Sequence, residues 1–262
     1  MISPLEKRAA ELRGTLLEMS HRVRAAHLGS ALSCVDLLIA LYFHAMDKDD
    51  RFILSKGHGV AALYGTLAQK GMMDPAQLFT FTQPGSALEE HPGPGTLPGI
   101  EAATGSLGHG LSLGAGMALS RRLKGETGRC FVLMGDGECN EGSVWEAAMF
   151  AGGQKLDRFC AIVDFNKWQA TGRSCDTMAL EPLAAKFQAF GWESREVDGH
   201  NMDVLVSALD QLPFGDGKPL ALIAHTVKGK GISFMEDDNN WHYRIPTREE
   251  VLAGKRELGL GQ

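Results

Sequence analysis

The chain has 262 residues, of which 44% are hydrophobic and 22% charged, and this composition is typical of an ordinary globular protein rather than a disordered chain. A net charge of -6 provides no basic surface and argues against a nucleic-acid-binding protein. The sequence has no signal-peptide core or membrane-spanning stretch, and its five cysteines show no disulfide or zinc pattern, so we expect a cytoplasmic protein.

The first part of the chain is predicted to be helical. Apolar residues at three- and four-residue spacing predict an amphipathic helix over residues 5–23, with Ser3 as its cap and Pro4 in its first turn. This helix is expected to end near residues 27–29, and a second helix is expected over residues 35–45.

A strand, a long loop and a helix are expected next. Residues 51–54 form a short apolar run typical of a strand, and the polar turn at 55–59 leads into a helix that ends near residue 70. Residues 81–108 are rich in proline and glycine and lack periodicity, so we predict a functional loop. A helix built of small residues follows at 111–123.

The centre of the chain is predicted to be a strand–helix–strand unit. Residues 131–134 and 159–163 are apolar runs typical of buried strands, and a helix at 141–154 connects them. Parallel strands joined by a helix lie side by side with their carboxyl ends on one edge, so Asp136 and Asn166 are expected to meet there. Ligands bind at this edge in open α/β sheets.

The remaining chain continues the alternation of helices and strands. We expect a helix at 182–190, a strand at 192–197, a helix at 202–212, a strand at 220–227 and a final helix that Thr247 and Glu250 begin with a capping box. The alternation predicts an α/β fold with a doubly wound, mostly parallel sheet and helices on both faces. No linker, repeat or composition shift interrupts it, so one domain is expected over residues 1–262.

Oxygen ligands and glycines at this sheet edge indicate a site for a metal and a phosphate. A carboxylate and an amide oxygen suit Mg²⁺, which takes further oxygens from phosphate and water. Gly135 and Gly137 allow the backbone to come close to a phosphate, and the next helix adds the partial positive charge of its N-terminus. The alternative is that Gly-Asp-Gly is only a tight strand-to-helix turn.

The central stretch resembles a known cofactor motif. Gly-Asp-Gly-Glu, then Glu-Gly-x-x-Trp-Glu-Ala, then Asp-x-Asn-Lys, all within residues 131–171, resemble the thiamine diphosphate motif of transketolases. The resemblance implies that Asp136, Asn166 and the main-chain carbonyl of Trp168 bind Mg²⁺, or Ca²⁺ or Mn²⁺ in its place. Many thiamine enzymes have Asn-Asn where this chain has Phe165-Asn166. The residues that it implies for binding thiamine diphosphate are His58, Gly105, Ser106, Leu107, Gly108, Gly135, Asp136, Gly137, Glu138 and Asn166.

Four histidines stand in polar or glycine-rich turns, and each one alone is compatible with a surface or structural role. They are His27, His58, His91 and His242. Together they fit the transketolase pattern, which includes SKGHG at 55–59 and TGSLG at 104–108, and the resemblance implies proton transfer and sugar-hydroxyl recognition. The match is uneven, because residues 26–29 read Ala-His-Leu-Gly rather than Gly-His-Pro-Gly, and residues 108–110 read Gly-His-Gly rather than Gly-Gln-Gly.

Two glutamates and two lysines have open interpretations. Glu141 and Glu146 are favourable at a helix N-terminus, but the resemblance implies catalytic roles in a carboxylate-and-water chain that links two active sites across a dimer. Lys228 and Lys230 either contact phosphate or only solubilise their loop.

The resemblance covers only the amino-terminal part of a transketolase. The pyrimidine-binding domain, whose glutamate activates the cofactor, and the carboxyl-terminal domain have no counterpart in this chain. The glycine-rich end at 258–262 favours a natural subunit over a truncated form. We therefore expect a split transketolase whose partner is a C-terminal-half subunit, in a heterotetramer with two copies of each chain. It would transfer a two-carbon ketol unit from a ketose phosphate to an aldose phosphate.

Other functions remain open from sequence. The same cofactor serves 1-deoxyxylulose-phosphate synthesis and keto-acid decarboxylation, and the substrate pocket that distinguishes them lies outside this chain. A non-catalytic scaffold or regulatory partner is a further alternative, which the intact metal-ligand residues disfavour. A nicotinamide-binding protein is disfavoured because no GxGxxG follows the first strand.

Overall fold

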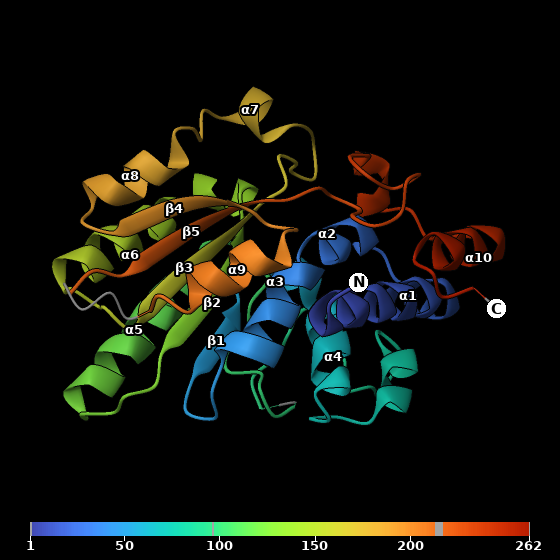
Figure 1. The fold of residues 1–262 in the computed structure, drawn as a ribbon, viewed down its shortest axis with the longest axis horizontal. Helices are drawn as coiled ribbons and strands as arrows, with labels where there is room; N and C mark the ends of the chain where they lie inside the picture. Colours follow the sequence, from blue (N-terminus) through green and yellow to red (C-terminus); the bar gives the residue numbers. More distant parts are fainter. Residues whose placement is uncertain (1, 96, 213–216, 262) are drawn as a thin grey trace.

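The chain is built around one parallel β-sheet. The computed structural model describes residues 2–95, 97–212 and 217–261. Five strands pair in the order β1-β2-β3-β5-β4, and every neighbouring pair is parallel (Figure 1). The strands are β1 (Arg51–Leu54), β2 (Cys130–Gly135), β3 (Phe159–Phe165), β4 (Glu193–Asp198) and β5 (Leu220–His225). The order reverses direction beyond β3, as in a doubly wound sheet, which confirms the predicted fold class.

Helices connect the strands and enclose the sheet. The α-helices are α1 (Pro4–Val23), α2 (Leu28–Ser33), α3 (Val35–Ala40), α4 (Val60–Gln69), α5 (Gly110–Leu123), α6 (Gly142–Gly153), α7 (Ser174–Thr177), α8 (Leu183–Ala189), α9 (Met202–Leu209) and α10 (Arg248–Glu257). A π-helical turn, η1 (Leu41–Ala45), follows α3. Short 3₁₀ turns form η2 (Gly57–Gly59), η3 (Pro75–Thr80), η4 (Gly137–Asn140) and η5 (Asn239–His242).

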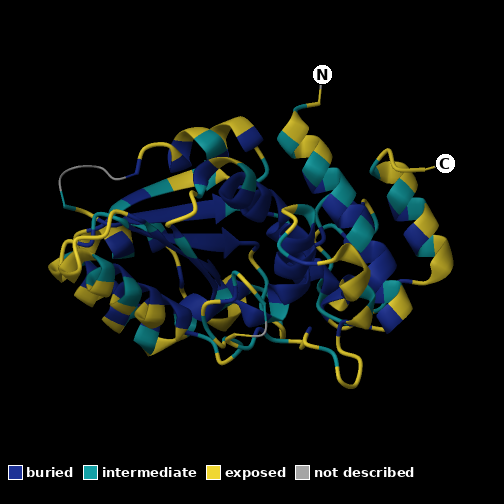
Figure 2. Cartoon of the chain, turned by 90° about the horizontal axis from the view of Figure 1, so that it is seen from below, coloured by how far each residue is buried: buried dark blue, intermediate teal, exposed yellow. Residues whose placement is uncertain are grey.

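Alternate residues of β1, β2, β3 and β5 point into two separate hydrophobic cores. In β2, Phe131 and Leu133 face a core built with α1 to α4 and α9, whereas Val132 and Met134 face a core built with α5, α6 and α8. Strands β1, β2, β3 and β5 lie in the buried centre of the molecule, the edge strand β4 is partly exposed, and the outward faces of the helices are exposed (Figure 2). Burial of a large apolar side chain contributes roughly 1.5–3 kcal/mol, so both faces hold the sheet in place.

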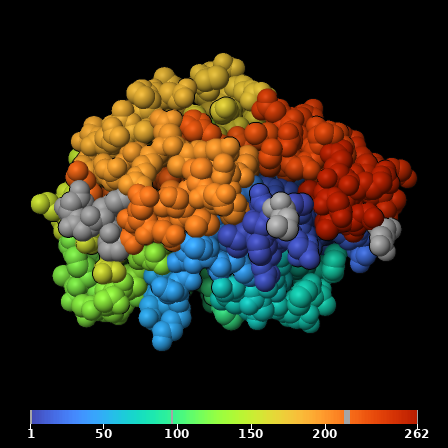
Figure 3. Space-filling model, viewed as in Figure 1, coloured from blue at the N-terminus to red at the C-terminus, as the bar shows by residue number. Residues whose placement is uncertain are grey.

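The first and last helices pack against each other. Ser3 and Glu6 form a capping box at the start of α1, and Thr247 and Glu250 form the predicted one at the start of α10. The space-filling view shows the C-terminal segment beside the N-terminal helix (Figure 3). Glu18 of α1 is buried between the two helices and accepts hydrogen bonds from cations on both.

Most predicted elements are confirmed within a few residues, but the stretch after α1 is not. Residues 27–29 were expected to be a helix end, yet α2 begins at Leu28, because His27 takes a left-handed backbone conformation (φ 64°) that lets a new helix start at once. All six residues of α2 are buried, so tertiary packing stabilises a helix that has no amphipathic pattern. The helix expected at 35–45 is α3 followed by the π-helical turn.

The other differences are local. The helix expected at 202–212 ends earlier, at Leu209, and the short elements η3 and α7 were not anticipated. The predicted loop at 81–108 contains no helix or strand in the part that the structure describes, and position 96 lies outside the described residues. Cys130 and Cys160 are buried free thiols, as expected. Among the described residues, no helix combines the length and apolar character that crossing a membrane requires.

Candidate functional site

A cavity of about 370 Å³ opens at the carboxyl ends of the strands. Eleven of the predicted site residues line it: His58, Gly105, Leu107, Gly135, Asp136, Gly137, Glu138, Glu141, Asn166, Trp168 and His242. Five predicted residues, His27, His91, Ser106, Gly108 and Glu146, lie outside this lining. Residues that the sequence did not single out also line the cavity, namely Ser30, Lys56, Asn140, Gln169, Ala170 and Thr171.

Asp136 and Asn166 reach the cavity from adjacent strands. The register pairs Gly135 with Asp164, so both side chains follow directly after paired strand ends. Both residues are buried, with 1% and 6% exposure. Burial raises the pKa of Asp136 to about 6, although the hydroxyl of Ser174, 2.6 Å from Oδ2, partly opposes this. A buried carboxylate with so little neutralising charge is a favourable place for a cation.

The donor set suits a hard cation with open positions. Asn166 Oδ1 accepts the Trp168 N–H at 3.1 Å, so the loop turns back towards the amide. Among the described residues, no three His, Cys, Asp or Glu side chains gather into a metal cluster. One carboxylate, one amide oxygen and a backbone carbonyl would leave coordination positions for phosphate and water, as Mg²⁺ requires. The residues present therefore fit the predicted Mg²⁺.

Glycines bring backbone from three segments close together. A Cβ on Gly57 would lie 2.7 Å from the nitrogen of Gly105, and a Cβ on Gly105 would lie 2.5 Å from the ring of His91. Gly105 also has φ 129°, which other residues rarely adopt. A Cβ on Gly137 would meet the side chain of Gln169 at 2.8 Å. These close approaches leave exposed backbone around the cavity that a side chain would otherwise cover.

Glu138 holds the cavity wall together. Its buried carboxylate accepts hydrogen bonds from the hydroxyl of Ser55, from the N–H of Gly108 at 2.9 Å and from the N–H of Gly135 at 3.2 Å. Burial raises the pKa of this carboxyl, although the three hydrogen bonds lower it in part. The side chain therefore ties together the ends of β1 and β2 and the 105–108 turn.

Two polar atoms at the cavity have no partner within the described chain. Asn140 Oδ1 and Gln169 Nε2 are both buried, and neither makes a hydrogen bond to any described residue. One is an acceptor and the other a donor, and both residues line the cavity. Buried polar groups are normally satisfied, so this pair fits a ligand that offers both a donor and an acceptor.

Behind the cavity lies a fully buried ion pair that the sequence analysis missed. Lys56 contacts Asp164, and Ser33 donates a hydrogen bond to the same carboxylate at 2.6 Å. Burial alone would raise the pKa of Asp164, but the ammonium of Lys56 outweighs this and lowers it. Burial likewise opposes the charge on Lys56, and Asp164 raises its pKa. The sequence did contain a signal for this pair, since Asp164 is a charged residue in the apolar strand β3 and Lys56 is a charged residue in the turn after β1.

Lys228 and Lys230, which the sequence left undecided, lie in different environments. Lys228 is buried, and its Nζ lies 2.6 Å from Asn239 Oδ1 and 3.2 Å from His242 Nδ1. Burial and the charge of Lys56 lower the pKa of Lys228 to about 8. Lys230 instead pairs with Glu236 at 3.2 Å on the surface.

The structure brings the four predicted histidines together. The ring of His27 lies 4.9 Å from that of His242, 6.0 Å from that of His58 and 6.4 Å from that of His91. Burial lowers the pKa of His27 and of His58. Burial and the Lys228 charge lower the pKa of His242 to about 3. These three rings are therefore neutral at pH 7, so each can accept a proton on one nitrogen and donate on the other.

The two predicted glutamates of α6 are both exposed on the described chain. Glu141 is the N-cap residue of α6, but its side chain makes no capping hydrogen bond and instead lines the cavity rim. Glu146 lies one turn further along α6, away from the cavity lining. The structure describes one copy of the chain, so their role across a dimer stays a prediction.

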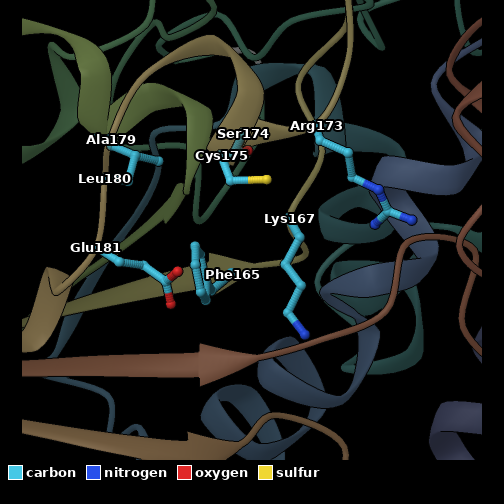
Figure 4. A pocket seen from close by; sticks show the side chains of 8 residues that line it. All are labelled: Phe165, Lys167, Arg173, Ser174, Cys175, Ala179, Leu180 and Glu181. Atoms are coloured by element: carbon cyan, nitrogen blue, oxygen red, sulfur yellow. The ribbon is translucent and has the colours of Figure 1, made fainter.

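A second cavity of about 480 Å³ lies beside the first, under the segment that follows β3. It is lined by Phe165, Lys167, Arg173, Ser174, Cys175, Ala179, Leu180 and Glu181 (Figure 4). The Arg173 side chain extends away from Cys175 and Glu181 (Figure 4). Ser174 connects the two cavities, because it lines this one and donates a hydrogen bond to Asp136, which lines the first.

The parallel sheet and the first cavity together define the class of protein. It is an α/β domain with a ligand site at the carboxyl edge of its parallel strands.

Comparison with known proteins identifies the family. A family model described as "Transketolase, thiamine diphosphate binding domain" matches residues 7–262. The chain is 41% identical to an apulose-4-phosphate transketolase subunit from Phocaeicola vulgatus, over 98% of this chain and 94% of that one. It is also 41% identical to the 6-deoxy-6-sulfo-D-fructose transketolase subunit SqwG of Clostridium sp., over 97% and 96%.

A solved structure gives the same result. Transketolase from Campylobacter jejuni superposes with a TM-score of 0.91 and 30% identity, over the whole of this chain and 44% of that one. The chain belongs to the transketolase family, whose members are ketol transferases, and corresponds to its thiamine diphosphate-binding domain. The predicted family, cofactor and enzyme class are thereby confirmed.

Proposed function

We propose that residues 1–262 form a single domain that acts as the thiamine diphosphate-binding subunit of a split transketolase. The enzyme transfers a two-carbon ketol unit from a ketose phosphate to an aldose phosphate. The observation that carries this proposal is the buried Asp136 carboxylate beside Asn166, at a glycine-lined cavity on the carboxyl edge of the sheet. The chain matches two transketolase subunits over more than nine-tenths of their length, and this supports the split arrangement.

The cavity residues have separate binding roles in this proposal. Asp136, Asn166 and the carbonyl of Trp168 would hold Mg²⁺, and the glycine backbone around Gly105 and Gly137 would accommodate the diphosphate. Ser106, Leu107, Gly108 and Glu138 would shape the wall of the site. When bound, thiamine diphosphate supplies the reactive carbon that takes up the ketol unit.

The histidine cluster would handle protons and sugar hydroxyls. His27, His58 and His242 are neutral at pH 7, so their ring nitrogens can accept a hydroxyl proton or donate to a carbonyl oxygen. The Lys228 ammonium lies within hydrogen-bond distance of His242 Nδ1, so Nδ1 is the acceptor and the proton of this ring lies on Nε2. We assign His91, which packs against Gly105, to the same cluster.

The partner is proposed to be a C-terminal-half transketolase subunit that carries the pyrimidine-binding domain. Two copies of each chain would form an α2β2 assembly, in which Glu141 and Glu146 face the symmetry-related copy. The names of the two relatives, which call each one a subunit, support a partner. A cytoplasmic location is part of the proposal, supported by five cysteines that are all free thiols. Cell fractionation tests the location.

The decisive experiment is a calorimetric titration of thiamine diphosphate with Mg²⁺ into this chain, alone and with a co-expressed candidate partner. We expect tight binding only with the partner, followed by ketol transfer between sugar phosphates. Cofactor binding with turnover of a keto acid instead would favour the decarboxylase alternative. Absence of binding under both conditions would leave the scaffold function as the better explanation.

A matched pair of variants tests the metal site. Asp136→Ala should abolish Mg²⁺-dependent cofactor binding and leave the fold intact, because it removes the one carboxylate at the proposed metal position. Asp203→Ala removes an exposed carboxylate of α9 and should bind the cofactor as the unmodified chain does. Circular dichroism checks the fold, and normal cofactor binding by Asp136→Ala would contradict the assignment.

A further inference from the structure

Two loops from distant parts of the chain meet over the cofactor cavity. The first follows β3 and carries Asn166 and Trp168, and the second follows β5 and carries Lys228 and His242. Each loop contains a residue other than glycine in the left-handed region: Lys167 has φ 69° and Asp237 has φ 59°. A lysine is uncommon in this conformation, so contacts elsewhere must hold the first loop in place.

Asp237 of the second loop is bound to two side chains of the first. Its Oδ1 accepts a hydrogen bond from Trp168 Nε1 at 2.7 Å and another from Arg173 Nη1 at 2.7 Å. Its Oδ2 accepts from Arg173 Nη2 at 2.6 Å, so the guanidinium contacts both carboxylate oxygens. The Arg173 guanidinium also stacks over the Trp168 ring, 3.8 Å from its centroid. We refer to Trp168, Arg173 and Asp237 as the interloop clamp.

Backbone contacts extend the clamp to the cavity on both sides. On the first loop, Trp168 N–H donates to Asn166 Oδ1, and Trp168 pairs with Arg173 in an isolated β-bridge. On the second loop, Asp237 N–H donates to the carbonyl of Lys228 at 2.9 Å. The position of one carboxylate is therefore coupled to an oxygen ligand proposed for the metal and to the backbone of Lys228.

The geometry of the clamp suits the positioning of the two loops more than the stabilisation of the fold. The side chains of Arg173 and Asp237 are 33% and 54% exposed, and ion pairs this open contribute little to folding. The two parallel hydrogen bonds from a planar guanidinium nevertheless fix direction as well as distance. A third contact, from Asn239 Nδ2 to the carbonyl of Ala170 at 3.1 Å, joins the same two loops.

We propose that Asp237 is a positioning residue, which sets the two loops so that the Trp168 carbonyl can hold the metal while the charge of Lys228 lies beside His242 in the wall of the same cavity. This inference rests on the proposed function for its purpose, but the contacts of the clamp are made entirely between residues of this chain. Asp237 is absent from the cavity lining, and so is Lys228, which adjoins the lining residue His242 with its Nζ 3.2 Å from Nδ1. It acts through Trp168 and Lys228.

Hydrogen exchange on the full chain without cofactor tests the clamp directly. Asp237→Asn keeps a residue that tolerates positive φ but removes one acceptor and the negative charge. We expect amide exchange about fivefold faster or more in both 167–173 and 228–242, with the melting temperature within about 2 °C of the unmodified chain. Asp176→Asn, an exposed carboxylate on α7, is the matched control. Unchanged exchange in either segment overturns the proposal.

A double-mutant cycle then tests positioning in the complex with the partner subunit. Asp237→Asn and Arg173→Gln should each raise the Kd for thiamine diphosphate with Mg²⁺ about tenfold, and the double variant should be no worse than either one. Asp237→Glu should recover part of the loss. Independent effects that multiply would overturn the proposal. If the unmodified complex binds no cofactor, the proposed function fails, while the exchange experiment still decides whether the clamp orders the loops.

Discussion

Lys228 is a single residue whose burial leaves a positive charge that an anion can neutralise. The residue is 1% exposed, lies close to the positive charge of Lys56, and has only Asn239 and His242 as described hydrogen-bond partners of its side chain. Burial lowers its pKa to about 8, so it remains mostly protonated at pH 7 with its charge poorly compensated. Lys228 adjoins the lining residue His242, so a diphosphate in the cavity would place the missing negative charge close to it.

The affinity for the cofactor should therefore fall at high pH. The pKa is lowered in the folded chain, so Lys228 loses its proton above about pH 8, and an anion then binds only when the proton is restored. We expect the Kd for thiamine diphosphate with Mg²⁺ to rise about tenfold per pH unit above 8. Lys228→Met should bind more weakly at pH 7 and lose this dependence. An identical pH profile in both proteins would exclude the role.

At the scale of elements, the contact between α1 and α10 depends on one buried carboxylate. Glu18 accepts hydrogen bonds from Arg22 at 2.7 Å, from Arg248 at 3.0 Å and from Lys255 at 2.6 Å. Burial alone would raise its pKa, but these three cations lower it from 4.5 to about 2. This pKa shift corresponds to a contribution of about 3 kcal/mol to the free energy of unfolding. Because the cations are exposed and screened by solvent, we expect only about 1–2 kcal/mol of it.

Replacement of this carboxylate should weaken the helix pair in a pH-dependent way. Glu18→Gln is expected to lower the free energy of unfolding by about 1–2 kcal/mol at pH 7. Because the folded pKa is depressed, the contribution is present above pH 4.5 and lost as the pH falls towards 2. Urea unfolding at several pH values measures the difference. Glu11→Gln, a surface change on the same helix, should cost less than about 0.5 kcal/mol. A gap between the Glu18 variant and the unmodified chain that persists at low pH would contradict the explanation.

For the molecule as a whole, apolar side chains remain exposed on neighbouring helices. Leu113 of α5 is 42% exposed, and Met149 and Phe150 of α6 are 58% and 43% exposed. The two helices pack against each other, and Glu146 lies on α6, whose N-cap residue is Glu141. Exposed apolar surface of this kind is typical of an interface between subunits.

Charges on this surface should disrupt the assembly. We expect the double change Met149→Asp and Phe150→Asp to reduce the mass of the complex with the partner below that of the heterotetramer, because a buried unpaired carboxylate is costly. Light scattering after size-exclusion chromatography measures the mass. Leu252→Asp, which changes a 43% exposed residue on α10, is the matched control. An unchanged mass would place the interface elsewhere.

The fold was predictable where local pattern and chain order agree. Apolar runs marked β1, β2 and β3, and the strand–helix–strand rule brought Asp136 next to Asn166 without any knowledge of the remaining chain. The short helix α2 was not predictable, because its six residues are all buried and show no periodicity. Packing against η5 stabilises it instead.

The sequence by itself determined the sheet, the motif at its edge and the family, since each depends on residue types at short and regular spacing. Tertiary structure alone decided which groups complete the site. Lys56 meets Asp164 across 108 positions, Ser174 reaches Asp136 across 38, and Asp237 binds Arg173 across 64. No local periodicity encodes such pairs, because they form only when loops from different strands converge at one edge of the sheet.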